Sequence, residues 1–323
     1  MTSSTRLLRR AVILVPLVAV FWGIVFASSF WKSILSLALI WGILACGVNL
    51  LGGYGNMLSL GHAGIMGAAA YGVAVAGVNY QLGELAQICA GLAAGLVCSA
   101  IFGMISIRTI GVYFLLVTLA LGMTVWGSAL RLNSVTGGDN GIRGLARPAL
   151  LDSVAGFGLS CLVVALLAVL ATKRVTGSRF GLALRGLADS EKRLEAIGYN
   201  VLMLRFVAFM ISGVFASVAG ILFAYYNRFV SPDVATFAVS GKVVLMMILG
   251  GAGTLSGPFL GALIVTVVEN YVSLYVTRWP TVLGAIYVAA VLFAPTGLVR
   301  LSHKTADRGR ASASPTLSEA SPP

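Results

Sequence analysis

The chain is divided into long stretches that contain no Asp, Glu, Lys or Arg. Seven of these stretches are 20–26 residues long, and one is 51 residues long. About 20 apolar residues in a helix cross the roughly 30 Å hydrocarbon layer of a membrane, so each shorter stretch fits one crossing and the longest fits two. The stretches are 11–31, 33–83, 85–107, 109–130, 153–172, 206–227, 243–268 and 279–299.

The composition agrees with a chain that lies mostly in lipid. Of the 323 residues, 59% are hydrophobic and only 10% are charged, whereas soluble domains carry about 25% charged residues. So few charges cannot cover a water-facing surface, which excludes a soluble globular domain, a disordered chain and a disulfide-stabilised secreted domain. The sequence predicts an all-α polytopic integral membrane protein with a membrane domain over 1–300 and a disordered cytoplasmic tail over 301–323.

Lysine and arginine gather in three segments that we assign to the cytoplasm. The segment 173–200 carries six of them, and others precede the first apolar stretch and follow the last. We therefore expect residues 173–200 and both termini on the cytoplasmic side. A cleaved secretory signal is the alternative for the first stretch, although its 21 apolar residues exceed the roughly 7–15 of a usual signal core.

This orientation requires two segments, 33–83 and 234–277, to return to the side from which they enter. Each carries a glycine cluster near its middle, at 52–55 and 250–253, and glycine is expected where a membrane helix breaks or turns tightly. Each segment either crosses twice or dips in and comes back, which gives ten spans or, with one re-entrant segment, eight. Paired interrupted helices indicate a binding or permeation site near the midplane; two helix hairpins with flexible turns are the alternative.

Small residues also recur at every fourth position in several stretches. In lipid this spacing favours close packing between helices and is a weaker indication of a transport path. The motifs are Gly91/Gly95, Ser212/Ala216/Gly220 and Gly257/Gly261.

The sequence carries no pattern typical of catalysis or of a metal site. The only Gly-Lys pair, Gly241-Lys242, is followed by Val243, so the chain has no phosphate-binding loop for ATP hydrolysis. Its two histidines are far apart, and its four cysteines lie singly in apolar stretches. We therefore predict neither an enzyme nor a metal or cofactor site. The spans also lack the series of acidic residues that proton-driven pumps use, while sodium coupling through backbone carbonyls stays open.

The cytoplasmic segment 173–200 predicts two short amphipathic helices between Gly181 and Gly198. Leucines and an isoleucine supply an apolar face, Asp189 and Arg193 are spaced as an i,i+4 pair, and Gly198 suits a helix end. A helical segment of this kind either lies on lipid headgroups or its own bundle, or docks in a groove of a partner subunit. Its mixed charges favour docking.

Five separated motifs resemble the permeases of high-affinity branched-chain amino-acid ABC importers. Residues 51–64 (LGGYGNMLSLGHAG) are similar to the family element Gly-Gln-x-Ser-Leu-Gly-His-Ala, and 136–141 (TGGDNG) to its Thr-Gly-Gly-x-x-Gly outer loop. Residues 178–198 resemble the ATPase-contacting loop, and 249–258 (LGGAGTLSGP) and 294–298 (APTGL) complete the order. The resemblance covers roughly 40–300 and is strongest to the LivM-like member of the heterodimeric permease pair.

The resemblance implies a permease domain over 1–300 in the bacterial inner membrane that hydrolyses no ATP itself. Its implied partners are a second permease subunit in a hetero- or homodimer, two cytoplasmic ATP-binding subunits and a periplasmic substrate-binding protein that delivers branched-chain or related small amino acids. It further implies three sets of functional residues: a translocation path at Asn56, Ser59, Gly61, His62, Gly250, Gly251 and Gly253; an outer docking or gating loop at Thr136, Gly137, Gly138 and Gly141; and an ATPase-coupling loop at Arg185, Asp189, Glu191, Arg193, Glu195 and Gly198.

Two positions depart from the family pattern. Asn56 stands where Gln is usual, and Lys242 stands where an acidic residue is common. The substrate therefore stays open among amino acids, amides and urea. The alternative function is a self-sufficient secondary transporter or channel for a small polar solute, and a membrane enzyme is a further rival that would need acid, base or metal clusters.

Overall fold

The computed structural model describes residues 22–24, 26–148, 151–275, 281, 284–285 and 288. The predicted N-terminal basic segment, most of the first and last predicted spans, the tail 301–323 and the sides on which the termini lie fall outside the described residues.

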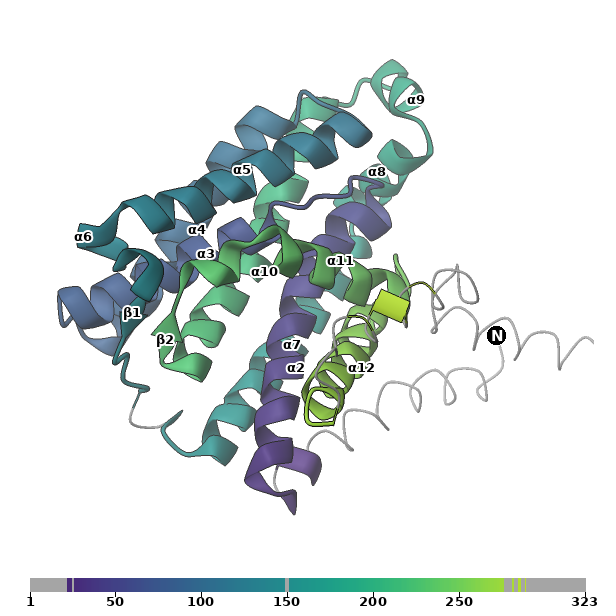
Figure 1. Ribbon diagram of the computed structural model, residues 1–323. Helices are drawn as coiled ribbons and strands as arrows, with labels where there is room; N and C mark the ends of the chain where they lie inside the picture. Colours follow the sequence, from purple (N-terminus) through teal and green to yellow (C-terminus); the bar gives the residue numbers. More distant parts are fainter. Residues whose placement is uncertain are drawn as a thin grey trace, which may run out of the picture.

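Five described helices are long and apolar enough to cross a membrane, which confirms the prediction of an all-α polytopic membrane protein (Figure 1). Each coincides with one of the charge-free stretches or with the first half of the longest, because lipid accepts only backbone whose polar groups are paired within the helix. They are α2 (Ser29–Asn49, continued to Tyr54 by a π-helical turn, η1), α4 (Glu84–Ser106), α5 (Val112–Arg131), α7 (Val154–Thr176) and α10 (Val201–Asn227).

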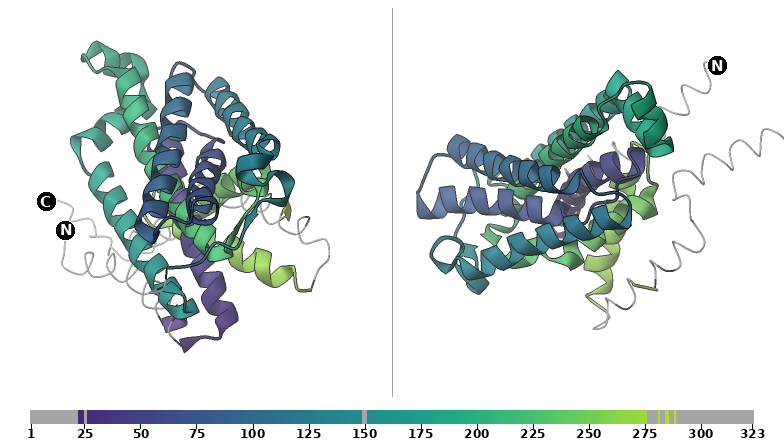
Figure 2. Two further views of the ribbon diagram at one scale, coloured as in Figure 1. Left: turned by 90° about the vertical axis from the view of Figure 1, so that its left-hand side faces the viewer. Right: turned by 90° about the horizontal axis from the view of Figure 1, so that it is seen from above.

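Shorter elements connect these helices. The helical ones are α3 (His62–Ala74) with the π-helical turn η2 (Val75–Asn79), α6 (Asn133–Thr136), η3 (Gly138–Asn140), α8 (Arg179–Asp189), α9 (Glu191–Ala196), η5 (Pro232–Ala235), α11 (Phe237–Gly250) and α12 (Gly257–Val272). Two strands, β1 (Ile142–Arg143) and β2 (Phe229–Val230), pair antiparallel, with Ile142 opposite Val230. The paired strands and the α8–α9 segment lie at opposite ends of the bundle, as Figure 1 and both views of Figure 2 show.

The long segment 33–83 runs along the bundle and back, as predicted. Helix α2 ends beside α8, where the Leu184 side chain packs against Gly55. The chain then returns through α3, and Asn79 Nδ2 donates a hydrogen bond to the Val135 carbonyl at the β1–β2 end. Both ends of the segment therefore lie at the β1–β2 end.

The segment 234–277 also returns to the end from which it enters, but as a short hairpin. Helices α11 and α12 have 14 and 16 residues, or about 21 and 24 Å, less than the thickness of the hydrocarbon layer. The Tyr271 ring stacks on Trp31 near the start of α2, with centroids 6.4 Å apart. Two helices this short fit the re-entrant alternative for this segment better than two full crossings.

The predicted small-residue motifs pack helices closely. Gly91 lies against Val73 and the Ala69 carbonyl, Gly95 against Ser217, and Gly220 against the Met66 carbonyl, so that α3, α4 and α10 meet backbone to backbone.

Candidate functional site

The two predicted helix breaks lie side by side. Gly53 approaches Gly253 so closely that a Cβ at position 53 would collide with the Gly253 amide nitrogen. Asn49, in the last turn of α2, joins the two breaks. The Gly253 amide donates to Asn49 Oδ1 at 2.8 Å, and Asn49 Nδ2 donates to the Thr254 carbonyl at 2.9 Å. One fully buried amide side chain thus fixes the tip of the re-entrant hairpin to the first break.

The first break begins where the helix stops at Asn56. This residue has a left-handed backbone (φ 53°), and the Met57 amide donates to the Leu51 carbonyl at 3.0 Å, a bond typical of a helix C-terminus. Asparagine tolerates left-handed backbone better than most side chains. Asn56, which stands where the family pattern has Gln, is therefore a residue that suits the left-handed backbone of this turn.

The chain after the turn is held on α5. The Leu60 amide donates to Thr118 Oγ1 at 3.1 Å, and the Gly61 amide donates to Ser59 Oγ at 3.2 Å. A Cβ at Gly61 would press against the Thr118 carbonyl. Ser59 and Gly61 are therefore packed positions in this conformation, with the Ser59 hydroxyl bound to its own backbone.

His62, the first residue of α3, links three helices. Its Nε2 lies 2.5 Å from Ser212 Oγ on α10, and Ser212 Oγ donates to the Gly47 carbonyl on α2 at 2.6 Å. Because the serine has one hydroxyl hydrogen, which it gives to Gly47, the imidazole is the donor at Nε2. Nδ1 then carries a bare lone pair, and it has no hydrogen-bond partner among the described residues. The structure thus places His62 in the helix core, 1% exposed.

The hairpin tip depends on glycine. Gly251 and Gly253 have φ of 120° and 74°, which side chains rarely adopt. Gly250 crosses Gly257 and Gly261 with the backbones in contact. Thr254 closes the turn, since its hydroxyl donates to the Gly251 carbonyl at 2.7 Å and accepts from the Gly257 amide at 3.1 Å.

Lys242 forms an ion pair inside the hairpin. Its Nζ lies 3.2 Å from Glu269 Oε2 on α12 and 4.2 Å from the centre of the Trp41 ring on α2. Both side chains are mostly buried, at 17% and 23% exposed.

A cavity of about 170 Å³ lies between the first break and the α8–α9 segment. Of the predicted path side chains, only Asn56 lines it. Its walls come from the break, the α4–α5 turn, the α8–α9 segment and α10: Gly55, Asn56, Met57, Thr109, Ile110, Gly111, Phe114, Leu187, Glu191 and Arg205.

The predicted outer loop closes the end of α5. Thr136 Oγ1 donates to the Ala129 carbonyl at 2.6 Å and accepts from the Gly138 amide at 3.3 Å. Gly137, Gly138 and Gly141 all have positive φ. The motif residues thus shape the loop, while Asp139 and Asn140 present its exposed surface.

Arg147 fastens this loop to α10. Its guanidinium donates to the carbonyls of Tyr225 and Tyr226, both at 2.7 Å, and lies over the Phe157 ring. Burial, and next the neighbouring Arg228, lower the pKa of Arg147. An arginine still keeps its charge at neutral pH, so it stabilises the carbonyl end of α10.

The α8–α9 segment confirms the predicted pair of short helices and corrects one detail. The chain breaks at Ser190, which caps α9 with its hydroxyl, so Asp189 and Arg193 lie on different helices, and no ion pair joins them among the described residues. Gly198 ends α9 with a φ of 91°, as expected.

Two of the coupling-loop side chains contact other parts of the chain, although one of them, Arg185, is exposed like the remaining three charged side chains. Arg185 donates to the Thr176 carbonyl at 2.8 Å and lies over the Tyr54 ring. Glu191 pairs with Arg205 at 2.6 Å. Asp189, Arg193 and Glu195 are exposed.

Three buried polar residues that join separate elements of the site are not singled out in the sequence analysis: Asn49, Arg205 and Ser212. Asn49 is the one amide side chain of the apolar helix α2, which is a signal in lipid. Arg205 bounds the stretch 206–227, yet the N-cap at Asn200 places it inside the helix. Ser212 belongs to the Ser212/Ala216/Gly220 motif, which by itself predicts helix packing and no hydrogen bond. The structure shows no group of three or more His, Cys, Asp or Glu suited to a metal within the residues it describes.

Comparison with known proteins decides the family. A model of the family described as "Branched-chain amino acid transport system / permease component" matches residues 30–295. The chain belongs to this family. It contains both helix breaks, the outer loop and the α8–α9 segment of the permease within the matched region.

Individual relatives agree with this assignment. The permease protein LivM of the high-affinity branched-chain amino acid transport system of Salmonella typhimurium is 29% identical over 299 residues, covering 83% of this chain and 70% of the relative. LivM of Escherichia coli is 28% identical over the same length. LivH of E. coli is 31% identical, but over 140 residues, which cover 42% of this chain and 45% of the relative. No solved structure matches the chain. The chain is therefore a membrane permease component of a multi-subunit transport system, and the match to LivM covers more of the chain than the match to LivH.

Proposed function

We propose that this permease is the LivM-like subunit of an ABC importer that carries a branched-chain or related small amino acid across the inner membrane. A second permease subunit, two ATP-binding subunits and a periplasmic binding protein complete the importer. The permease supplies the path, and the ATP-binding subunits supply the hydrolysis.

The α8–α9 segment carries this proposal. It stands at one end of the bundle and exposes Leu182 and Ile197, at 70% and 75%, beside the exposed charges of Arg193 and Glu195. Apolar side chains ringed by mixed charges fit a groove of a protein partner better than anionic lipid.

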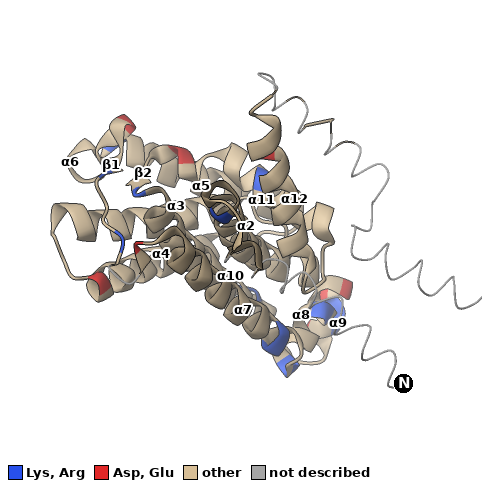
Figure 3. Cartoon of the chain, turned by 90° about the horizontal axis from the view of Figure 1, so that it is seen from below, with Lys and Arg blue, Asp and Glu red and all other residues tan. Residues whose placement is uncertain are grey.

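The distribution of charge supports a cytoplasmic position for this end. Among the described residues, eight Lys and Arg lie at the α8–α9 end against three Asp and Glu, whereas five lie at the β1–β2 end against four (Figure 3). Short loops rich in Lys and Arg stay in the cytoplasm.

The path is proposed to run past the paired breaks. The hairpin tip at Gly250–Gly253 contacts the first break there through Asn49 and Gly53, and the adjoining cavity is lined by the turn at Asn56 and by the α8–α9 segment. Ser59, Gly61 and His62 would line the path only after a rearrangement, since all three are packed in this conformation. Alternating access in transporters supplies such rearrangements.

Reconstitution tests this function. The permease pair with its ATP-binding subunits, placed in liposomes with the binding protein, should accumulate labelled leucine only when ATP is supplied to the ATPase side. The matched control is the same assembly with a hydrolysis-deficient ATP-binding subunit, which should give no uptake. Ion-gradient-driven uptake by this chain alone would favour the secondary transporter instead.

A further inference from the structure

Arg205 is a buried cation in a membrane-spanning helix. It lies one turn beyond the Asn200 cap of α10, and its side chain is 7% exposed. An arginine at such a position is unfavourable unless partners neutralise and hydrogen-bond it.

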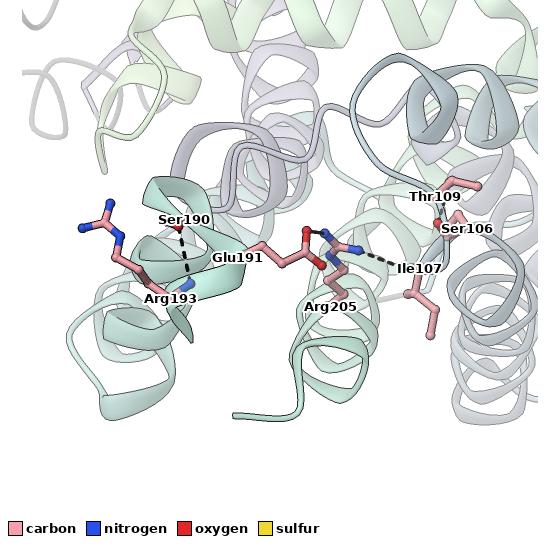
Figure 4. A network of polar contacts seen from close by, with 7 residues as sticks. All are labelled: Ser106, Ile107, Thr109, Ser190, Glu191, Arg193 and Arg205. Carbon is pink, nitrogen blue, oxygen red and sulfur yellow. Dashed lines mark hydrogen bonds and ion pairs between the residues drawn. The ribbon is translucent and has the colours of Figure 1, made fainter. Parts of the chain in front are cut away.

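Its partners come from two other elements (Figure 4). Arg205 NH2 lies 2.6 Å from Glu191 Oε2, at the first residue of α9, and NH1 donates to the Ile107 carbonyl at 3.2 Å, after the end of α4. The turn at Ile107 is itself fixed, because Thr109 donates to the Ser106 carbonyl at 2.7 Å. One guanidinium thus joins α9, α10 and the α4–α5 turn.

The same pair forms one wall of the cavity below the first break. Glu191 and Arg205 line it together with Asn56 and Gly111. Helix α8 reaches the break by direct packing, through Leu184 on Gly55. Helix α9 faces the break across the cavity, and the Glu191–Arg205 pair is the ion pair that ties it to a spanning helix in the part of the chain described.

We propose that Arg205 is a positioning residue that carries movement of α9 to α10 and to the α4–α5 turn, and so sets the shape of the cavity under the first break. This inference rests on the proposed function, in which the ATP-binding subunits grip α8–α9. The fork geometry of the guanidinium suits the role, since two of its nitrogens hold two elements in fixed relation.

The test uses the complete reconstituted importer and the variant Glu191→Gln, which keeps the shape of the side chain and removes its charge. Assembly with the ATP-binding subunits and ATP hydrolysis should persist, while uptake should fall about tenfold, within the range of typical coupling between sites. ATP hydrolysed per amino acid transported should therefore rise. Arg205→Lys, which keeps the charge but loses the fork, should show the same change to a smaller extent.

Asp152→Asn is the matched control, because it removes a carboxylate from the exposed Arg228–Asp152 pair at the other end of the bundle. It should leave the ratio unchanged. If Glu191→Gln does not assemble, Glu191→Asp, which keeps the charge and shortens the reach, is measured in its place. An unchanged ratio in the assembled variant would overturn the proposal, as would an equal rise in Asp152→Asn. Failure of the proposed function would show differently, as absence of ATP-dependent uptake in the unmodified importer.

Discussion

Asn49 binds the backbone of Gly253 from 204 positions away in the sequence. The side chain comes from the last turn of α2, and the glycine lies at the tip of the re-entrant hairpin. The two breaks therefore form one structural unit, in which the hairpin tip cannot leave the first break without releasing a buried amide.

Replacing Asn49 should loosen the hairpin. In Asn49→Ala the Gly253 amide and the Thr254 carbonyl lose their partner, and unpaired buried groups cost about 1–3 kcal/mol each. We expect a lower thermal midpoint in detergent and faster proteolysis within 250–256. Asn270→Ala is the control, because in the part of the chain that the structure describes its amide bonds to the Thr266 carbonyl of its own helix and to no other element. An equal loss in both variants would contradict the role of Asn49 in holding the hairpin.

His62 should be required for transport. His62→Ala removes the donor to Ser212 and leaves a space between α2, α3 and α10, so uptake should fall while expression is retained. Ser212→Ala should lower uptake too. Uptake in the double variant should fall by less than the two single effects combined, because both single variants lose the same His62–Ser212 hydrogen bond. Normal uptake in His62→Ala would leave His62 as a packing residue.

The contribution of the Lys242–Glu269 ion pair to stability can be measured with single and double variants. Lys242→Met or Glu269→Gln alone leaves a mostly buried charge without its partner, and breaking a buried pair costs about 3–5 kcal/mol. The double variant should recover much of that loss. Thermal midpoints of the three variants measure this, and a double variant no more stable than the worse single one would argue against the pair.

Charge reversal at two coupling-loop residues, Arg185 and Glu195, should have different effects on stability. Glu195→Lys alters an exposed side chain on α9, so it should weaken co-purification with the ATP-binding subunit and leave the thermal midpoint unchanged. Arg185→Glu should also lower the midpoint, since Arg185 holds the Thr176 carbonyl and the Tyr54 ring. Unchanged co-purification in Glu195→Lys would argue against docking through this face.

The sequence predicted local features better than contacts between distant segments. Charge-free stretches located the helices, and the spacing of Leu184, Leu187 and Leu194, all buried, located α8 and α9. Glycine clusters at 52–55 and 250–253 located the breaks, because glycine acts through its own backbone.

The joining of the breaks could not be predicted. It depends on Asn49, one amide in an apolar helix, and hydropathy gives no partner for it. The pairing of Lys242 with Glu269 could not be predicted for the same reason. The two residues flank the charge-free stretch 243–268, and they come together only because the hairpin brings α11 and α12 side by side.

The position of Ile197 tests the central claim most directly, because it asks whether α9 faces the cytoplasm and is covered by an ATP-binding subunit. Ile197→Cys, made in a Cys89→Ser background to remove the exposed native thiol, is treated with a membrane-impermeant maleimide. We predict labelling in inside-out vesicles, no labelling in intact spheroplasts, and protection when the ATP-binding subunits are bound. Labelling from the outside of spheroplasts would contradict the account.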